Sequence, residues 1–99
     1  MPNAVVAHSS EFRIFETAEF NKALTRLGPP RFLRGKLDTY VYPQLRCGPY
    51  FGPNIRKLQG YEPATWRYRI GRYRVFYSLD EADRIVFVLT IDDRKDAYR

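Results

Sequence analysis

The fold of this protein is decided by residues 66–77, which read WRYRIGRYRVFY. Aromatic or aliphatic residues alternate with arginine on both sides of Gly71. Such alternation, in a run rich in aromatic and β-branched residues, is typical of β-strands, and a glycine between two such runs is typical of a tight turn. The stretch therefore predicts a β-hairpin.

The position of the glycine also predicts the pairing of the two strands. If Gly71 and Arg72 form a two-residue loop, the glycine stands first, as a type II′ turn requires. The expected cross-strand pairs are then Ile70 with Tyr73, Arg69 with Arg74, Tyr68 with Val75, Arg67 with Phe76, and Trp66 with Tyr77.

The two faces of this hairpin differ in character. The face expected to join the core carries Trp66, Tyr68, Val75 and Tyr77. The other face carries Arg67, Arg69 and Arg74, and like charges opposed across strands are destabilising. No acidic residue lies between Pro63 and Leu79. Because guanidinium groups suit phosphate and carboxylate, we expect an anion there. The alternatives are a solvated face, or ion pairs to acidic residues elsewhere in the chain.

The length of the chain predicts the number of domains, and its net charge predicts the kind of partner. The chain has 99 residues and a net charge of +6. We expect a flexible N-terminal tail over residues 1–10, which holds the only histidine, His8, and a single domain over residues 11–99. A histidine in a tail is more often incidental than catalytic. The excess of basic over acidic residues favours nucleic acid, a ribosome or an acidic protein as partner.

Other classes are disfavoured. No apolar run is long enough to span a membrane, and residues 1–8 do not resemble a secretion signal, so a soluble cytoplasmic protein is expected. Cys47 is the only cysteine, which excludes a disulfide and predicts a buried structural thiol. We expect no metal and no cofactor.

The N-terminal half predicts a strand and two helices. Residues 11–16 alternate as a strand would, and Thr17 is a plausible helix cap. A first amphipathic helix, ended by residues 28–30, buries Phe20, Ala23, Leu24 and Leu27. A second, from about Pro30, buries Leu33, Leu37, Tyr40, Val41 and Leu45. Pro43 predicts that this helix stops or kinks near Val41.

The remaining segments complete an α+β domain. Residues 47–64 are rich in glycine and proline and predict a loop region, with a short strand or turn at residues 55–58. Residues 78–83 predict an acidic turn, and residues 85–91 a strand in the middle of a sheet. The order is an N-terminal strand, an antiparallel helical hairpin and a three-stranded antiparallel meander. The helices would cover one face of a single sheet and leave the arginine face concave and open.

These residues resemble a known family. Residues 52–98, with Arg56-Lys57-Leu58, Gly60, the arginine hairpin, the apolar strand and Arg94 to Tyr98, are similar to the RelE/ParE superfamily of toxins from type II toxin–antitoxin pairs. The resemblance is to the RelE branch, whose members cut messenger RNA in the ribosomal A site. It implies the RelE-like fold, a cognate antitoxin as partner, and the ribosome and its mRNA as targets.

The resemblance also implies a set of site residues. Its catalytic residues map to Arg67, Arg74, Arg94 and Tyr98. Its RNA-binding residues map to Arg56, Lys57, Arg69 and Arg72, although Arg56 and Lys57 could equally belong to a solvated loop. The implied mechanism is RNA cleavage without a metal, in which arginines stabilise the phosphorane and Tyr98 acts as base or acid.

Two other functions fit the same fold. One is a ParE-like toxin that poisons DNA gyrase without cutting nucleic acid. That function would not need three arginines converging with a tyrosine on one face, which favours the nuclease. The other is a catalytically inactive member of the fold that binds RNA or the ribosome.

Overall fold

The predicted hairpin forms in the predicted register. In the computed structural model, β3 (Trp66–Ile70) and β4 (Tyr73–Asp80) pair antiparallel, from Trp66 opposite Tyr77 to Ile70 opposite Tyr73. Gly71 has a φ of +62°, in the left-handed region that the first position of a type II′ turn requires. The structure describes residues 11–28 and 31–94, so the predictions for the tail with His8 and for Tyr98 fall outside it.

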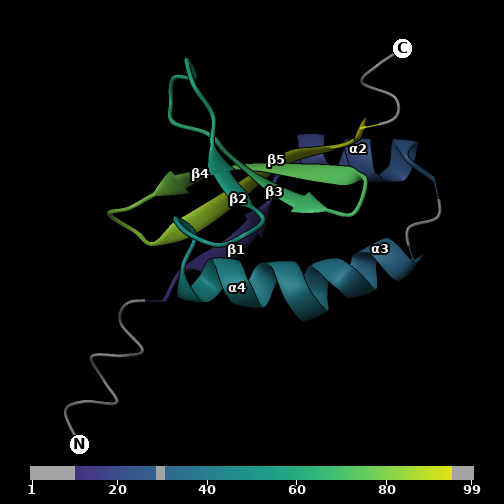
Figure 1. Ribbon diagram of the computed structural model, residues 1–99, viewed down its shortest axis with the longest axis horizontal. Coiled ribbons are helices and arrows are strands. Elements are labelled where there is room, and N and C mark those ends of the chain that lie inside the picture. Colours follow the sequence, from purple (N-terminus) through teal and green to yellow (C-terminus); the bar gives the residue numbers. More distant parts are fainter. Residues whose placement is uncertain (1–10, 29–30, 95–99) are drawn as a thin grey trace, which may run out of the picture.

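The hairpin lies within a five-stranded mixed sheet of order β1-β5-β4-β3-β2 (Figure 1). The outer strands are β1 (Arg13–Glu16), parallel to β5, and β2 (Ile55–Lys57), antiparallel to β3. The strand β5 (Ile85–Asp93) lies inside the sheet, as its continuous apolar sequence predicted. With helices packed on this sheet, the α+β class is confirmed. The meander of three strands is extended by a fourth, β2.

One predicted turn is displaced. Ser78–Asp80 continue β4 instead of opening an acidic turn, because they pair with Phe87, Val86 and Ile85. The turn comes three residues later, at residues 81–84. Polar composition suggested the turn at Ser78, but ladder hydrogen bonds to the long strand β5 outweigh that local preference.

The helices begin where the sequence predicted. The first is α2 (Ala18–Arg26), which packs on β5 and is capped by Thr17, whose hydroxyl accepts a hydrogen bond of 3.1 Å from the amide of Phe20. The second is one continuous rod made of α3 (Arg31–Lys36), the π-helical turn η1 (Leu37–Val41) and α4 (Tyr42–Cys47). The rod does not stop at Val41, but its hydrogen-bond pattern changes there, because the π-helical turn η1 ends at Val41, just before Pro43, which has no amide proton to donate.

The π-helical turn explains which side chains the rod buries. Leu33, Leu37, Val41 and Leu45 follow one another every four residues, and all are buried. In a regular α-helix such spacing drifts by about 40° per step, or about 120° over three steps. One wider turn absorbs the drift and keeps all four on the core side. Tyr40, predicted to be buried, is instead 62% exposed.

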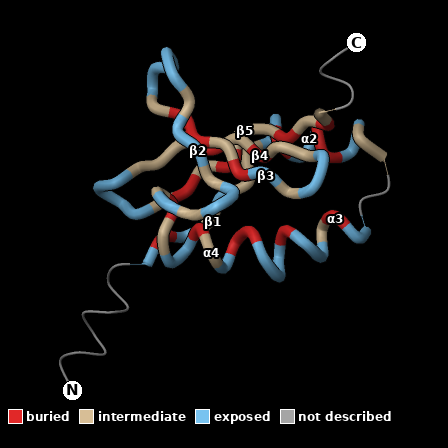
Figure 2. Tube along the Cα trace, in the orientation of Figure 1, coloured by how far each residue is buried: buried red, intermediate tan, exposed pale blue. Residues whose placement is uncertain are grey.

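The core lies between the sheet and these helices, as the buried segments in Figure 2 show. Trp66 and Tyr77, predicted for the core, are buried and stack on each other with ring centroids 6.2 Å apart. The Tyr77 hydroxyl donates a hydrogen bond of 2.7 Å to the carbonyl of Pro49. The Pro49 loop is thereby tied to the centre of the sheet.

Cys47 is exposed, so the predicted buried thiol is wrong. It stands two positions after the buried Leu45 and is therefore rotated by about 200° from it around the helix axis, away from the core. Among the described residues, none of the helices has the length and apolar character needed to cross a membrane.

A polar network fastens the rod to the first strand. Arg34 donates to Glu16 at 2.6 Å and 3.3 Å, and the Tyr42 hydroxyl donates to the same carboxylate at 2.7 Å. Burial alone would raise the pKa of Glu16, but the hydrogen bonds from Arg34 and Tyr42 outweigh it and hold the pKa below the ordinary value of 4.5. The same environment raises the pKa of Tyr42, first through burial and then through its bond to Glu16.

Glu16 therefore predicts a pH-dependent stability. Its folded pKa is depressed, so the stabilisation is complete above about pH 4.5 and is lost as the pH falls through the lower folded value. Glu16→Gln should cost about 1–2 kcal/mol of unfolding free energy at neutral pH. It should also flatten the loss of stability as the pH falls below about 4.5. Urea unfolding across this range measures both, with Glu11→Gln, an exposed residue, as control. An unchanged slope in Glu16→Gln would contradict the assignment.

Candidate functional site

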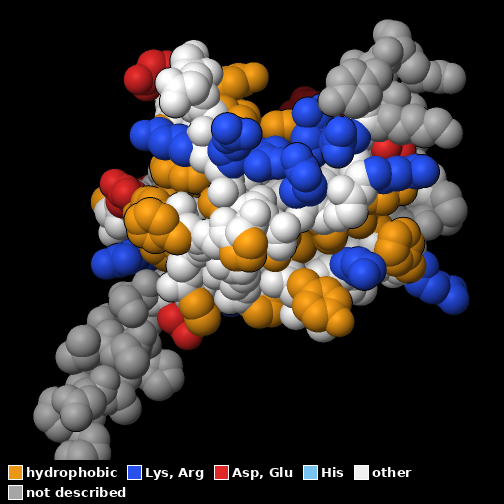
Figure 3. All heavy atoms as spheres, viewed as in Figure 1, with side chains coloured by type: hydrophobic (Ala, Val, Ile, Leu, Met, Phe, Trp, Pro, Cys, Tyr) orange, Lys and Arg blue, Asp and Glu red, His pale blue; other side chains and the backbone are white. Residues whose placement is uncertain are grey.

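Arginines from four segments meet in a hollow on the open face of the sheet. The hollow has a volume of about 250 Å³. Among the described residues it is lined by Leu58 and five arginines: Arg56, Arg67, Arg69, Arg74 and Arg94. Figure 3 shows basic side chains gathered in a band over the strands, above the helical layer of α3 and α4. We call this feature the arginine hollow.

Strand alternation and register create the hollow. Arg67 and Arg69 are two residues apart on β3 and so share a face. Arg56 is the cross-strand partner of Arg67, and Arg74 is the partner of Arg69. Arg94 directly follows β5, and its amide donates a hydrogen bond of 2.7 Å to the carbonyl of Arg72. The sequence prediction of a convergent arginine face is thus realised in three dimensions.

Arg67 has the most demanding environment of the five. Its Nε atom is buried and has no hydrogen-bond partner among the described residues. Burial first, and then the positive charges of Arg69, Arg56 and Arg74, lower the pKa of its guanidinium. An arginine nevertheless stays protonated at neutral pH. A buried donor without an acceptor is costly, so this position is suited to an anion that supplies the missing acceptor.

Arg74 is held differently. Its Nε and Nη2 atoms each donate a hydrogen bond of 2.9 Å to the carboxylate of Asp92, which comes from the end of β5. Asp92 offsets the repulsion between Arg74 and its partner Arg69 and fixes the plane of the guanidinium. For Arg74, the alternative of an ion pair from elsewhere in the chain is therefore the correct one. The sequence alone did not identify Asp92 as this partner, because the register of β4 against β5 is what places Asp92 opposite Arg74.

Two of the predicted RNA-binding residues lie away from the hollow. Arg72 is in the β3–β4 turn, exposed, with its Nε atom 3.0 Å from the carboxylate of Asp93. Lys57 adjoins Arg56 on β2, and alternation turns it to the opposite face, where its Nζ atom lies 5.5 Å from the ring centre of Trp66.

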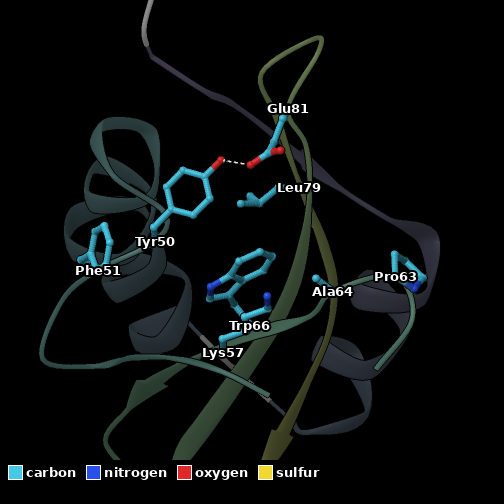
Figure 4. Close-up of a pocket in the computed structure, with 8 residues that line it drawn as sticks. All are labelled: Tyr50, Phe51, Lys57, Pro63, Ala64, Trp66, Leu79 and Glu81. Atoms are coloured by element: carbon cyan, nitrogen blue, oxygen red, sulfur yellow. Dashed lines mark hydrogen bonds between the residues drawn. The ribbon is translucent and has the colours of Figure 1, made fainter. Parts of the chain in front are cut away.

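Lys57 borders an aromatic pocket of about 530 Å³ (Figure 4). In this pocket the hydroxyl of Tyr50 donates a hydrogen bond to Glu81, and the ring of Trp66 lies below them. The bond to Glu81, together with burial, raises the pKa of Tyr50. The pocket is therefore chemically different from the arginine hollow and lies on another side of the sheet.

The arginine hollow can bind and stabilise negative charge. Several fixed guanidinium groups aimed at one point suit a phosphate and the extra charge that develops on it during transfer. The described lining contains no histidine, carboxylate or tyrosine, so it offers no general base or acid of its own. Nor do the described residues contain a cluster of three His, Cys, Asp or Glu side chains that could hold a metal.

Comparison with solved structures links this fold to toxin–antitoxin proteins. A RelBE toxin–antitoxin complex from Mycobacterium tuberculosis is 27% identical at a TM-score of 0.68, covering 85% of this chain and 92% of that chain. A RelE–RelB complex from Pyrococcus horikoshii is 29% identical at a TM-score of 0.52, covering 85% and 96%. A RelB–RelE complex from Methanococcus jannaschii, 20% identical at a TM-score of 0.62 and covering 85% and 94%, shares the fold. Curated protein sequences give no significant match.

A family model gives the assignment at sequence level. The model described as the ParE toxin of the type II toxin-antitoxin system parDE matches residues 14–98. This range includes the helices, the arginine hairpin and all of β5. The chain therefore belongs to this family of type II toxins, within the RelE/ParE superfamily.

Proposed function

We propose that this toxin is a ribosome-dependent endoribonuclease that cuts messenger RNA in the ribosomal A site and so inhibits translation in the cytoplasm. The observation that carries the proposal is the arginine hollow with the buried, unpaired Nε of Arg67 at its wall. A scissile phosphate would supply the acceptor that this atom lacks. A toxin that acted only by binding a protein would not require this concentration of cations around one point.

The proposed reaction is a transfer within the RNA itself. The 2′-hydroxyl loses its proton and attacks the neighbouring phosphorus, the 5′-oxygen of the next nucleotide leaves with a proton, and a 2′,3′-cyclic phosphate remains. Arg67, Arg74 and Arg94 would stabilise the phosphorane charge. Tyr98 is the proposed proton carrier.

The chemistry of the hollow also explains why a ribosome is proposed. Because the described lining lacks a general base or acid, positioning must supply a large part of the rate. Holding the attacking oxygen and the phosphorus in line can contribute several orders of magnitude. A ribosome that fixes the codon in the A site would provide such positioning, and the free toxin should be a weak nuclease.

The test is cleavage mapping in a translation extract. Wild-type protein, purified free of antitoxin, should generate new 5′ ends within codons of a single message, detected by primer extension. Arg74→Ala should reduce this cleavage about 10- to 100-fold. The effect is smaller than for an unpaired arginine because Asp92 already neutralises part of the Arg74 charge. An uncut message with normal translation would exclude the nuclease.

A second candidate is inhibition of DNA gyrase. It is favoured because residues 14–98 match the family model described as the ParE toxin of the type II toxin-antitoxin system parDE. In that case purified wild-type protein should block supercoiling by gyrase while leaving messages intact in the extract. The two assays, run on the same preparation, separate the candidates.

We also infer a cognate antitoxin as partner. The support is the family of type II toxins and the similar solved structures, which are toxin–antitoxin complexes. The net charge of +6 favours an acidic antitoxin. Co-expression with a cognate antitoxin should restore growth of cells that are inhibited by the toxin alone.

A further inference from the structure

A second recess lies beside the arginine hollow on the open face of the sheet. Its volume is about 280 Å³. It is lined by Tyr61, Thr65, Phe76, Leu89 and Thr90. None of these residues belongs to the site predicted from the sequence, and they form what we call the aromatic recess.

The recess and the hollow are neighbours. Phe76 is the cross-strand partner of Arg67, and the guanidinium carbon of Arg74 lies 5.7 Å from the centre of the Phe76 ring. Thr65 stands two residues before Arg67, which directs both side chains to the same face. A ligand bound in the hollow at Arg67 therefore needs to extend by only one strand spacing, about 5 Å, to enter the recess.

An irregularity in the sheet shapes the floor of the recess. Phe76 pairs with Thr90 and Tyr77 pairs with Val88, so Leu89 is an extra residue between two regular pairs. Such a bulge redirects side chains, and bulges are frequent beside functional sites. Here Leu89 and Thr90 both line the recess, although consecutive residues of a regular strand would face opposite ways.

One wall comes from the long β2–β3 loop, which rises from the sheet on the side away from α3 and α4 (Figure 1). It contributes Tyr61, which is 58% exposed although it is a large aromatic residue. The loop turns at Gly60, whose φ of +81° favours glycine. An exposed aromatic ring at the edge of a recess can stack on a flat ligand.

The lining suits a nucleobase. Two aromatic rings and a leucine provide apolar surface, and two threonine hydroxyls provide hydrogen-bonding groups. The Thr65 hydroxyl donates to the carbonyl of Pro63 at 3.1 Å, which leaves its oxygen able to accept. The Thr90 hydroxyl makes no side-chain hydrogen bond to the described residues, so it can donate or accept. Stacking on aromatic side chains beside a cationic groove is the usual way in which proteins hold unpaired bases.

We propose that the aromatic recess binds one base of the RNA strand whose phosphate lies in the arginine hollow, with Tyr61 stacking on that base. This inference rests on the proposed function for the identity of the strand. It adds a subsite that selects and orients a nucleotide next to the phosphate, while the arginines supply the sequence-independent attraction. Tyr61 is a binding residue here and takes no part in bond cleavage.

The test measures binding separately from cleavage. The probe is a trinucleotide with 2′-O-methyl sugars, which cannot be cut, carrying 2-aminopurine in the middle; its fluorescence falls when the base stacks. The competitors are the same trinucleotide with adenine, and one with an abasic site, at one fixed salt concentration because phosphate binding depends on salt. Wild type should bind the adenine competitor about tenfold more tightly than the abasic one.

Variants of Tyr61 make the assignment specific. Tyr61→Ala should reduce the tenfold preference to about twofold or less, and Tyr61→Trp should retain it. Phe51→Ala removes an aromatic residue that is 84% exposed at a different pocket and should bind like wild type. Equal binding of both competitors to wild type, no binding of either, or an unaltered preference in Tyr61→Ala would overturn the subsite. A wild type that prefers the base but leaves messages uncut in the extract would refute the nuclease and retain the subsite.

Discussion

For the proposed nuclease, Arg67→Met is expected to remove nearly all cleavage and, at the same time, to make the protein more stable. Loss of one fixed cation at the reacting phosphate should reduce the cleavage rate about 10²- to 10³-fold. The buried Nε of Arg67 has no partner among the described residues, and three neighbouring arginines repel its charge. Replacing it with an apolar side chain of similar length should therefore raise the unfolding free energy by about 1 kcal/mol.

The measurements are urea unfolding and cleavage mapping on the same preparations. Arg46→Met provides the matched control, because Arg46 is exposed on α4 and should change stability by no more than about 0.5 kcal/mol and leave cleavage unchanged. If Arg67→Met is less stable than wild type, Arg67 has a structural partner in the folded protein. Its guanidinium would then not be available to bind an anion.

The largest loss of stability is expected from Tyr77→Ala. Tyr77 is fully buried, stacks on Trp66 and closes the hydrogen bond to Pro49. Removing a buried aromatic side chain from a packed core costs about 3–5 kcal/mol. That is a large part of the total of about 5–15 kcal/mol typical of a folded domain, so the variant should be partly unfolded at physiological temperature.

Tyr77→Phe separates packing from hydrogen bonding. It keeps the ring but leaves the Pro49 carbonyl without its donor, and should cost about 1–2 kcal/mol. Tyr40→Ala, at an exposed aromatic position on η1, should stay within about 0.5 kcal/mol of wild type. Thermal unfolding ranks the three variants. If Tyr77→Phe were as unstable as Tyr77→Ala, the hydrogen bond and not the packing would dominate.

Local patterns predicted the parts of the fold that depend on neighbouring residues. The hairpin register followed from alternation around Gly71, and the start of α2 followed from Thr17. The parallel pairing of β1 with β5 could not be predicted in this way, because it joins segments about 70 residues apart through backbone atoms that carry no sequence signature. The exposure of Tyr40 depends on a π-helical turn, which a helical period of 3.6 residues does not anticipate.

The candidate site also combines residues that local patterns place correctly with residues whose position depends on distant contacts. Arg67, Arg69 and Arg74 were placed on one face because two adjacent strands fix them. The partnership of Arg74 with Asp92 needs the register of β4 against β5, which a bulge shifts by one residue. Lys57 was grouped with Arg56 on the family resemblance, yet strand alternation turns the two side chains to opposite faces. The aromatic recess was missed because its residues come from the β2–β3 loop, from β4 and from the bulge in β5.

The parallel pairing of β1 with β5 determines when during synthesis the fold can be completed. Thr17, at the end of β1, donates to the carbonyl of Val88, 71 residues later in the sequence. The β1 edge of the sheet and the arginine hollow, which needs Arg94, cannot be completed until β5 has emerged. Such distant contacts form late. The nascent chain therefore completes the arginine hollow only near the end of synthesis.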